Sequence, residues 1–313
     1  MVQKLALDFV RTTEAAAMSA AWWVGKGNKK AADQAATEAM RKAFNQIDID
    51  GTVVIGEGER DEAPMLFIGE KVGTGNGPKV DIAVDPLECT NFTARGEPNS
   101  IAVFAAAPSG TLLHAPDGYM QQIGVGQDCV GTIDLDASPE ENITAVARCL
   151  GKDVKNVSVI MLERDYNAAL LEGVRKTGCK IMLVRDGTVW GAIASAMKGT
   201  GIDLFLGSGA APEGVISAVA LKCLEGEFQG RLWFKSDEQK VRAGKMGITD
   251  LQKKYTMNEL VRTDNALFIA TGVTAGPFLN GVELGKNSAR THSVVMNAQT
   301  KSIRYIDARH TFA

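Results

Sequence analysis

The sequence has few cysteines, almost no net charge and no long apolar run. The five cysteines are odd in number and show no CxxC spacing. This excludes a disulfide framework and a thiolate zinc site, and it indicates a reducing compartment, which we expect to be the cytoplasm. The formal net charge of -3 at pH 7 gives no electrostatic sign of a nucleic-acid or membrane partner.

Membrane insertion and export signals are also missing from the pattern. No apolar stretch approaches the roughly 20 residues that a membrane-spanning helix requires. The first residues, "MVQKLALDFVRTTEAA", carry charges every few positions and contain no sustained apolar block. We therefore expect neither a membrane segment nor a signal peptide.

What is present is ordinary globular composition, with 313 residues of which 45% are hydrophobic and 23% are charged. That length allows one large or two modest domains. In the first part, helical spacing and apolar runs predict two helices followed by strands. The expected helices cover residues 7–25 and 29–45, and the expected strands cover 51–56, 79–84, 100–108 and 111–116.

A different pattern begins near residue 140, where predicted helices and strands alternate. Ser138, Pro139 and Gly151 have the spacing of an N-cap, a first helical residue and a helix stop. The alternation that follows predicts parallel βαβ units. We expect an α/β protein with a layered fold: a mixed sheet in an N-terminal subdomain over residues 1–140, and a second, largely parallel α/β subdomain over 141–313.

The stretch "VDIAVDPLECT", residues 80–90, allows two interpretations. Asp85, Pro86 and Glu88 fit a helix start, with aspartate as N-cap, proline at the first position and glutamate closing a capping box. Alternatively, Asp85, Glu88 and Thr90 are directed at a metal ion and a water molecule. The stretch alone favours the helix start.

Other strand ends favour the second interpretation. Glu57 follows the apolar run "VVIG", and Glu213 lies at the strand-to-helix turn "LGSGAAPEGV". Ligands bind α/β proteins at such ends, and gathered carboxylates repel one another unless cations neutralise them. Hard oxygen ligands without histidine or cysteine favour Mg²⁺ or Mn²⁺.

Four stretches together resemble a known family: "IDGTVVIGEGERDEAPMLFIGEKVGTG", "VDIAVDPLECT", "APDGYM" and "GAAPEGVISA". They are similar to the class II fructose-1,6-bisphosphatases, which belong to the lithium-sensitive, metal-dependent sugar and inositol phosphatases. The likeness extends from "RTTEAAAMSAAWW" to "THSVV". It implies the layered sugar-phosphatase fold and a requirement for Mg²⁺ or Mn²⁺.

The resemblance also implies roles for individual residues. Metal ligands are expected at Asp33, Glu57, Asp85, Glu88 and Glu213. Asp61 and Thr90 would hold and activate the attacking water, and Lys29 would face a phosphate group. Contacts to substrate are expected at Glu88, Cys89, Thr90, Tyr119, Arg164, Asp165, Tyr166, Asp186, Gly187, Thr188 and Ala210. Without the resemblance, Asp33 is interpreted as a surface acid of a helix and Lys29 as a solvated lysine.

Four residues depart from the family pattern. Cys89 and Ala210 stand where the family usually has glycine, Tyr166 where it has arginine, and Thr188 where it has aspartate. A side chain at a position that needs φ > 0 costs roughly 1–2 kcal/mol, and tyrosine cannot grip a phosphate bidentately as arginine does. We expect an intact hydrolytic centre with an altered grip on substrate.

The expected activity is hydrolysis of the 1-phosphate of fructose-1,6-bisphosphate, with sedoheptulose-1,7-bisphosphate as a second substrate, in gluconeogenesis or Calvin-type carbon metabolism. The alternatives are a phosphatase with the same centre that acts on inositol or nucleotide phosphates, and a catalytically weakened homologue that only binds sugar phosphates. The expected partners are a sugar bisphosphate and further copies of the chain in a homo-oligomer, a dimer or a tetramer.

Overall fold

The structure is a computed structural model that describes residues 2–56, 65–116 and 118–312. It contains two compact units, one formed by Met1–Leu112 with Thr263–Ala313 and the other by Leu113–Arg262. This division differs from the expected boundary near residue 140. The strand after residue 118 pairs only within the second unit, and the last 50 or so residues return to the sheet of the first.

The first unit is built on a mixed sheet. Its strands have the order β12-β13-β11-β4-β3-β1-β2, and β14 pairs with the other edge of β13. Only β1 and β3 pair in parallel among these described strands, and the rest of the ladder is antiparallel. The strands are β1 (Asp50–Ile55), β2 (Lys71–Val72), β3 (Lys79–Glu88), β4 (Ile101–Pro108), β11 (Leu267–Gly272), β12 (Glu283–Leu284), β13 (Ser288–Asn297) and β14 (Ile303–Thr311).

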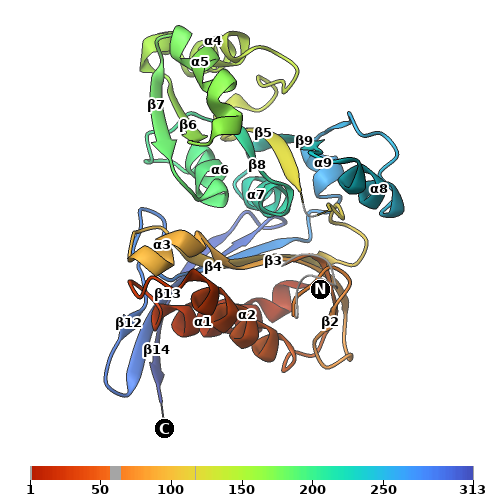
Figure 1. Cartoon of the computed structure of the whole chain (residues 1–313), viewed down its shortest axis with the longest axis vertical. Coiled ribbons are helices and arrows are strands. Elements are labelled where there is room, and N and C mark those ends of the chain that lie inside the picture. The colour runs from red at the N-terminus through yellow and green to blue at the C-terminus, as the bar shows by residue number, and fades with distance from the viewer. Residues whose placement is uncertain (1, 57–64, 117, 313) are drawn as a thin grey trace. The chain divides into compact units, whose positions relative to one another are not determined.

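Two long helices cover one face of this sheet (Figure 1). The short 3-10 helix η1 (Val2–Leu5) leads into α1 (Ala6–Ala21), and α2 (Lys29–Phe44) follows a loop. Phe9, Phe44 and Phe104 bury their rings completely and meet edge to face, with centroids 5.4 Å and 5.0 Å apart. The helical spacing of apolar residues in both segments therefore corresponds to an apolar stripe that packs on the sheet.

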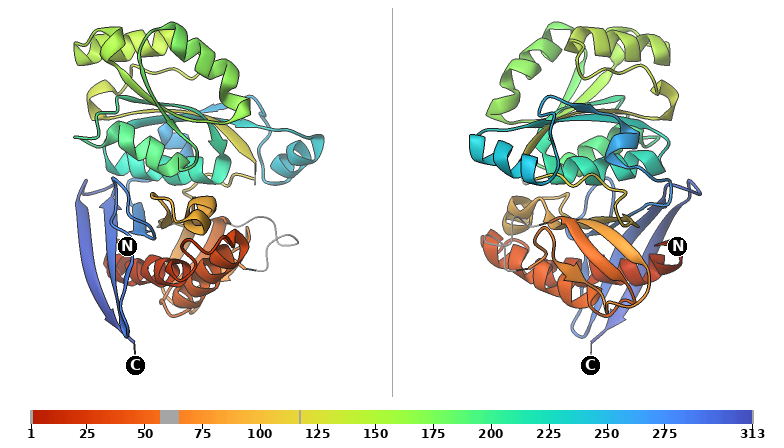
Figure 2. Two further views of the ribbon diagram at one scale, coloured as in Figure 1. Left: turned by 60° about the vertical axis from the view of Figure 1, so that its left-hand side comes forward. Right: turned by 90° about the vertical axis from the view of Figure 1, so that its right-hand side faces the viewer.

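The second unit contains a six-stranded sheet in the order β10-β9-β5-β8-β6-β7. Helices α4 and α5 cover one face and α6 and α7 cover the other, as Figure 2 shows. Its strands are β5 (Tyr119–Val125), β6 (Ser158–Leu162), β7 (Lys180–Val184), β8 (Leu204–Ala210), β9 (Glu227–Trp233) and β10 (Lys254–Tyr255). Its helices are η2 (Gln127–Cys129), α4 (Pro139–Leu150), η3 (Val154–Asn156), η4 (Asp165–Asn167), α5 (Ala168–Lys176), α6 (Thr188–Ala196), α7 (Ala211–Cys223), α8 (Asp237–Lys245) and α9 (Met257–Leu260).

The expected α/β class is confirmed, and several local predictions hold. Helix α4 begins with a capping box between Ser138 and Glu141, has Pro139 in its first turn and ends at Gly151, whose φ is 63°. The sheet of the second unit is mixed rather than largely parallel: among its described strands only β6 pairs in parallel, with β7 and β8, and β5 and β9 join antiparallel. No described helix combines the length and the apolar character that crossing a bilayer would need.

Some elements differ from expectation. Residues 111–116 form no strand beyond a single bridge at Leu112. Strands β5, β9 and β14 and helix α8 were not expected. Glycine, glutamine or charged residues interrupt the apolar residues of these three strands, so the strands lack a simple alternation of apolar and polar residues.

Candidate active site

Asp85 and Glu88 both lie in β3, so the helix-start interpretation of this stretch is wrong. A β-bulge separates them. Asp85 pairs with Val103 and Glu88 pairs with Ile101, so three steps on β3 match two steps on β4. In a regular strand, residues three apart point to opposite faces. The extra residue cancels that alternation, and one oxygen of each carboxylate lies within 4.8 Å of the other.

Local hydrogen bonds fix the end of β3. Oδ1 of Asp85 accepts a hydrogen bond from the Leu87 amide at 3.0 Å, and the Thr90 hydroxyl donates to the Leu87 carbonyl at 3.0 Å. Helix α3 (Thr90–Arg95) begins directly afterwards. Asp85 is half-buried and Glu88 is buried, which strengthens the repulsion between their charges.

Asp33 joins this acidic group from α2. Burial, and secondly the negative charge of Asp85, raise the pKa of Asp33 to about 6. Asp33 is half-buried, and its carboxyl is close enough to Asp85 to respond to that charge, which a fully solvated helix acid would not do. Lys29 lies one turn earlier on the same helix and is exposed. The i, i+4 spacing places Lys29 and Asp33 on one face of α2.

Cys89 occupies the position between Glu88 and Thr90 with a left-handed backbone, at φ 68° and ψ 47°. Its side chain is buried, and its carbonyl accepts a hydrogen bond from the Ser100 hydroxyl at 3.1 Å. The position where the family usually has glycine therefore does have φ > 0. Only glycine adopts that region without a steric cost, so Cys89 carries backbone strain beside the acidic group.

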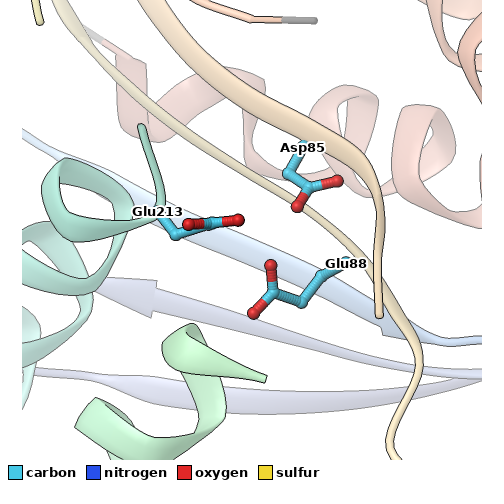
Figure 3. A group of neighbouring side chains, drawn as sticks. All are labelled: Asp85, Glu88 and Glu213. Carbon is cyan, nitrogen blue, oxygen red and sulfur yellow. The ribbon is translucent and has the colours of Figure 1, made fainter. Parts of the chain in front are cut away.

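In the second unit, Glu213 lies in the first turn of α7, after Ala211 and Pro212. Ala210 precedes the helix with φ -69° and ψ 146°. That conformation is open to any residue, so alanine causes no backbone strain here, unlike Cys89. Figure 3 draws the three carboxylates of Asp85 and Glu88 from β3 and of Glu213 from the start of α7.

The predicted substrate residues of the second unit come from loops that follow its strands. Arg164 and Asp186 form an ion pair at 3.5 Å across the loops after β6 and β7. Thr188 is buried at the start of α6, directly after Gly187, whose φ is 98°. Asp165 begins η4 and is exposed.

Tyr119 and Tyr166 meet in an aromatic cluster that also contains Trp233. The ring centroids are 5.3 Å apart between the tyrosines, and Trp233 lies 5.5 Å from Tyr119 and 5.7 Å from Tyr166. Burial raises the pKa of Tyr166, so its hydroxyl is neutral over the physiological range. The ammonium of Lys235 lies over this cluster, 3.5 Å from the Tyr119 ring centroid.

Trp233 and Lys235 are absent from the residues that the sequence singles out. Pairing of β5 with β9 places Trp233 opposite Tyr119, although 114 positions separate them in the chain. A single sequence gives no signal for that register. Two further predicted residues, Glu57 and Asp61, lie outside the described residues.

Comparisons with known proteins agree with the resemblance. The family model described as bacterial fructose-1,6-bisphosphatase, glpX-encoded, matches residues 3–310. The chain is 41% identical to the D-fructose 1,6-bisphosphatase class 2/sedoheptulose 1,7-bisphosphatase of Synechococcus sp. (strain JA-3-3Ab), over 99% of this chain and 96% of that protein. It is also 41% identical to the fructose-1,6-bisphosphatase 1 class 2 of Escherichia coli (strain K12), with the same coverage of both chains.

Proposed function

The chain belongs to the family of bacterial, glpX-encoded fructose-1,6-bisphosphatases, and we propose that it is itself a metal-dependent fructose-1,6-bisphosphatase. It hydrolyses the 1-phosphate of fructose-1,6-bisphosphate to fructose 6-phosphate and inorganic phosphate. The same centre accepts sedoheptulose-1,7-bisphosphate, an activity printed in the name of the Synechococcus relative. The observation that carries the proposal is the bulge in β3, which places the Asp85 and Glu88 carboxylates together next to Asp33.

The described carboxylates fit a hard divalent cation. Asp85 and Glu88 offer only oxygen donors, and Asp33, whose pKa is raised first by burial and then by the charge of Asp85, adds a third carboxyl that a nearby cation would keep ionised. We assign the binding of Mg²⁺ or Mn²⁺ to Asp33, Asp85 and Glu88, and on the family resemblance also to Glu57 and Glu213. When bound, such an ion neutralises phosphoryl oxygens and stabilises the leaving alkoxide.

The other residues of the chain position the reactants. The Thr90 hydroxyl and the Asp61 carboxylate hold the water, whose oxygen attacks phosphorus while the bond from phosphorus to the sugar oxygen breaks. Lys29 contributes positive charge to the phosphate, and Tyr119, Arg164, Tyr166 and Asp186 hold the sugar and its second phosphate. The water supplies the proton that the leaving alkoxide takes up, and no covalent bond to the protein forms.

Phosphate release from a panel of substrates tests the proposal. The panel contains fructose-1,6-bisphosphate, sedoheptulose-1,7-bisphosphate, inositol 1-phosphate and adenosine 3′,5′-bisphosphate, each with Mg²⁺, with Mn²⁺ or with chelator. Metal-dependent release that favours fructose-1,6-bisphosphate supports the proposal. A preference for the inositol or nucleotide substrate refutes it in favour of a related phosphatase, and binding without turnover identifies a sugar-phosphate-binding homologue.

We further propose that the enzyme works in the cytoplasm in gluconeogenesis or Calvin-type carbon metabolism, as a homo-oligomer. Light scattering of the protein as it elutes from a size-exclusion column measures its mass in solution. A mass of two or four chains supports the oligomer, whereas a mass of 33.3 kDa refutes it.

A further inference from the structure

Lys235 is a cation that three aromatic side chains of the second unit hold in place. Its Nζ lies 3.5 Å from the ring centroid of Tyr119, 5.3 Å from that of Tyr166 and 5.4 Å from that of Trp233. Aromatic faces attract an ammonium through their quadrupole, but they carry no net charge. A carboxylate in the same place would have cancelled the charge, whereas these rings orient it and leave it positive.

Two acids near Lys235 form ion pairs with other cations. Asp237, two residues along the chain, pairs with Lys240 at 2.7 Å, and Asp186 pairs with Arg164. In the described part of the chain, no carboxylate forms an ion pair with Lys235. The Lys235 side chain is exposed, so its three N–H donors remain accessible to a ligand.

The backbone around Lys235 is ordered. Its amide donates to the Gln239 side chain at 2.8 Å, and Ser236 caps α8 by accepting a hydrogen bond from the Gln239 amide at 3.3 Å. These two hydrogen bonds to Gln239 limit the backbone entropy that is lost when a ligand binds the Lys235 side chain. The site therefore presents one positive charge that is held against the rings of Tyr119, Tyr166 and Trp233.

We propose that Lys235 binds the phosphate group of the substrate that is not cleaved. The inference rests on the proposed function and deepens it. Tyr166 stands where the family has an arginine, and a neutral hydroxyl cannot replace a guanidinium as a phosphate ligand. The Lys235 ammonium lies 5.3 Å from the ring centroid of Tyr166, so it supplies, from the segment after β9, the positive charge that an arginine at position 166 would carry.

Steady-state kinetics of Lys235→Met and Lys235→Arg test the role, with Lys240→Met as the matched control. Lys240 is an exposed lysine of the same segment, and its partner is Asp237. Loss of a charged hydrogen bond predicts that Lys235→Met raises KM for fructose-1,6-bisphosphate about tenfold or more, with kcat little changed. Fructose 1-phosphate, which lacks the second phosphate, should show no change, and Lys235→Arg should retain most of the affinity.

Equal losses on both substrates would mean that Lys235 is merely structural, and no loss on either would remove it from the site. Calorimetric titration with fructose 6-phosphate separates this inference from the proposed function, because it requires no turnover. The product keeps the phosphate in question, so about tenfold weaker binding to Lys235→Met than to wild type is expected. If wild type binds it in this way but releases phosphate from no bisphosphate, only the proposed function fails.

A second inference concerns two thiols of the second unit. The Sγ atoms of Cys129, at the end of η2, and Cys149, near the end of α4, are 2.6 Å apart. Both are free thiols, and Cys129 is buried while Cys149 is exposed. Burial raises the pKa of Cys129 to about 12, so the exposed Cys149 is the thiol that an oxidant in solution reaches.

We propose that Cys129 and Cys149 form a reversible disulfide when a peroxide oxidises the protein. Cys149 attacks the peroxide, the O–O bond breaks, and a sulfenic acid and one water form. The Cys129 sulfur then displaces the second water and closes the S–S bond. Two thiol hydrogens and two electrons have passed to the peroxide.

Thiol counting, intact mass and non-reducing peptide mapping test this site after treatment with hydrogen peroxide. Wild type should lose two of its five thiols and about 2 Da, with Cys129 and Cys149 in one linked peptide. Its melting temperature should rise by about 5 °C, because the cross-link restricts the unfolded chain. Cys129→Ser and Cys149→Ser should abolish both changes and Cys179→Ser should preserve them. A link between other cysteines, or oxidation to sulfinic acid without a link, overturns the inference.

Discussion

The left-handed backbone at Cys89 predicts an inverted order of stability for two substitutions. At most positions alanine is more stable than glycine, because glycine loses about 0.5–1 kcal/mol more through its unfolded-state entropy. A non-glycine residue in the left-handed region costs about 1–2 kcal/mol. Cys89, at φ 68° and ψ 47°, lies in the centre of that region. We therefore expect Cys89→Gly to exceed Cys89→Ala in free energy of unfolding by about 0.5–1 kcal/mol.

Comparing glycine with alanine removes the contribution of the thiol. Both variants lose the same sulfur from Cys89, a residue that is 5% exposed in the wild type, so their difference reports the backbone. Thermal unfolding should give Cys89→Gly a melting temperature about 1–3 °C above that of Cys89→Ala. Ala94 is the matched control, since it is buried in the helix that follows Cys89 and Ala94→Gly should lower stability by about 0.5–1 kcal/mol.

An alanine variant as stable as the glycine variant would refute the reasoning, because it would show no strain at this position. The glycine substitution also tests the functional role of the residue. We expect Cys89→Gly to raise kcat/KM on fructose-1,6-bisphosphate, because the family uses glycine between the two working residues. An unchanged kcat/KM would remove Cys89 from the substrate site.

Three further substitutions follow from the structure. Asp85→Asn should lower metal-dependent phosphate release by about two orders of magnitude or more, and retained activity would exclude Asp85 from the metal set. Tyr166→Arg should raise kcat/KM on fructose-1,6-bisphosphate by about tenfold, through a bidentate phosphate contact, and a fall would contradict that placement. The hydrogen bond from Lys253, followed by the Thr256 amide, lowers the pKa of Glu259 to about 2. The stability that this carboxylate contributes is present above its unfolded pKa near 4.5 and is lost as the pH falls toward 2. Between about pH 5 and pH 3, the melting temperature of Glu259→Gln should therefore fall less than that of the wild type. An equal loss would refute that linkage.

Local rules predicted the features that depend on a few neighbouring residues. The capping box and glycine stop of α4 follow from nearby residue types, whereas the left-handed position at Cys89 was suggested only by the glycine that the family has there. The β3 bulge does not follow from them. Asp85-Pro86-x-Glu88 satisfies the rules for a helix start, and only pairing with β4 keeps these residues in a strand.

Long-range register accounts for most of what the sequence could not give. Trp233 faces Tyr119 because β9 pairs with β5, and that pairing brings Lys235 to the aromatic cluster. Asp33 responds to Asp85 because α2 packs on the sheet beside β3. In each case the chemistry depends on two segments distant in the chain, and neither segment alone identifies its partner.

The departures from the family divide by the kind of interaction that they change. Asp33, Asp85 and Glu88 are all carboxylates, so the proposed metal site keeps the negative charge that a divalent ion requires. In the proposed function, Tyr166 and Thr188 would change contacts to groups of the substrate that do not react. Contacts of that kind stabilise the ground state and the transition state equally, so altering them changes KM more than kcat. Substrate preference is therefore the property in which this chain should differ most from its relatives, while the rate of phosphate release at saturation stays close to theirs.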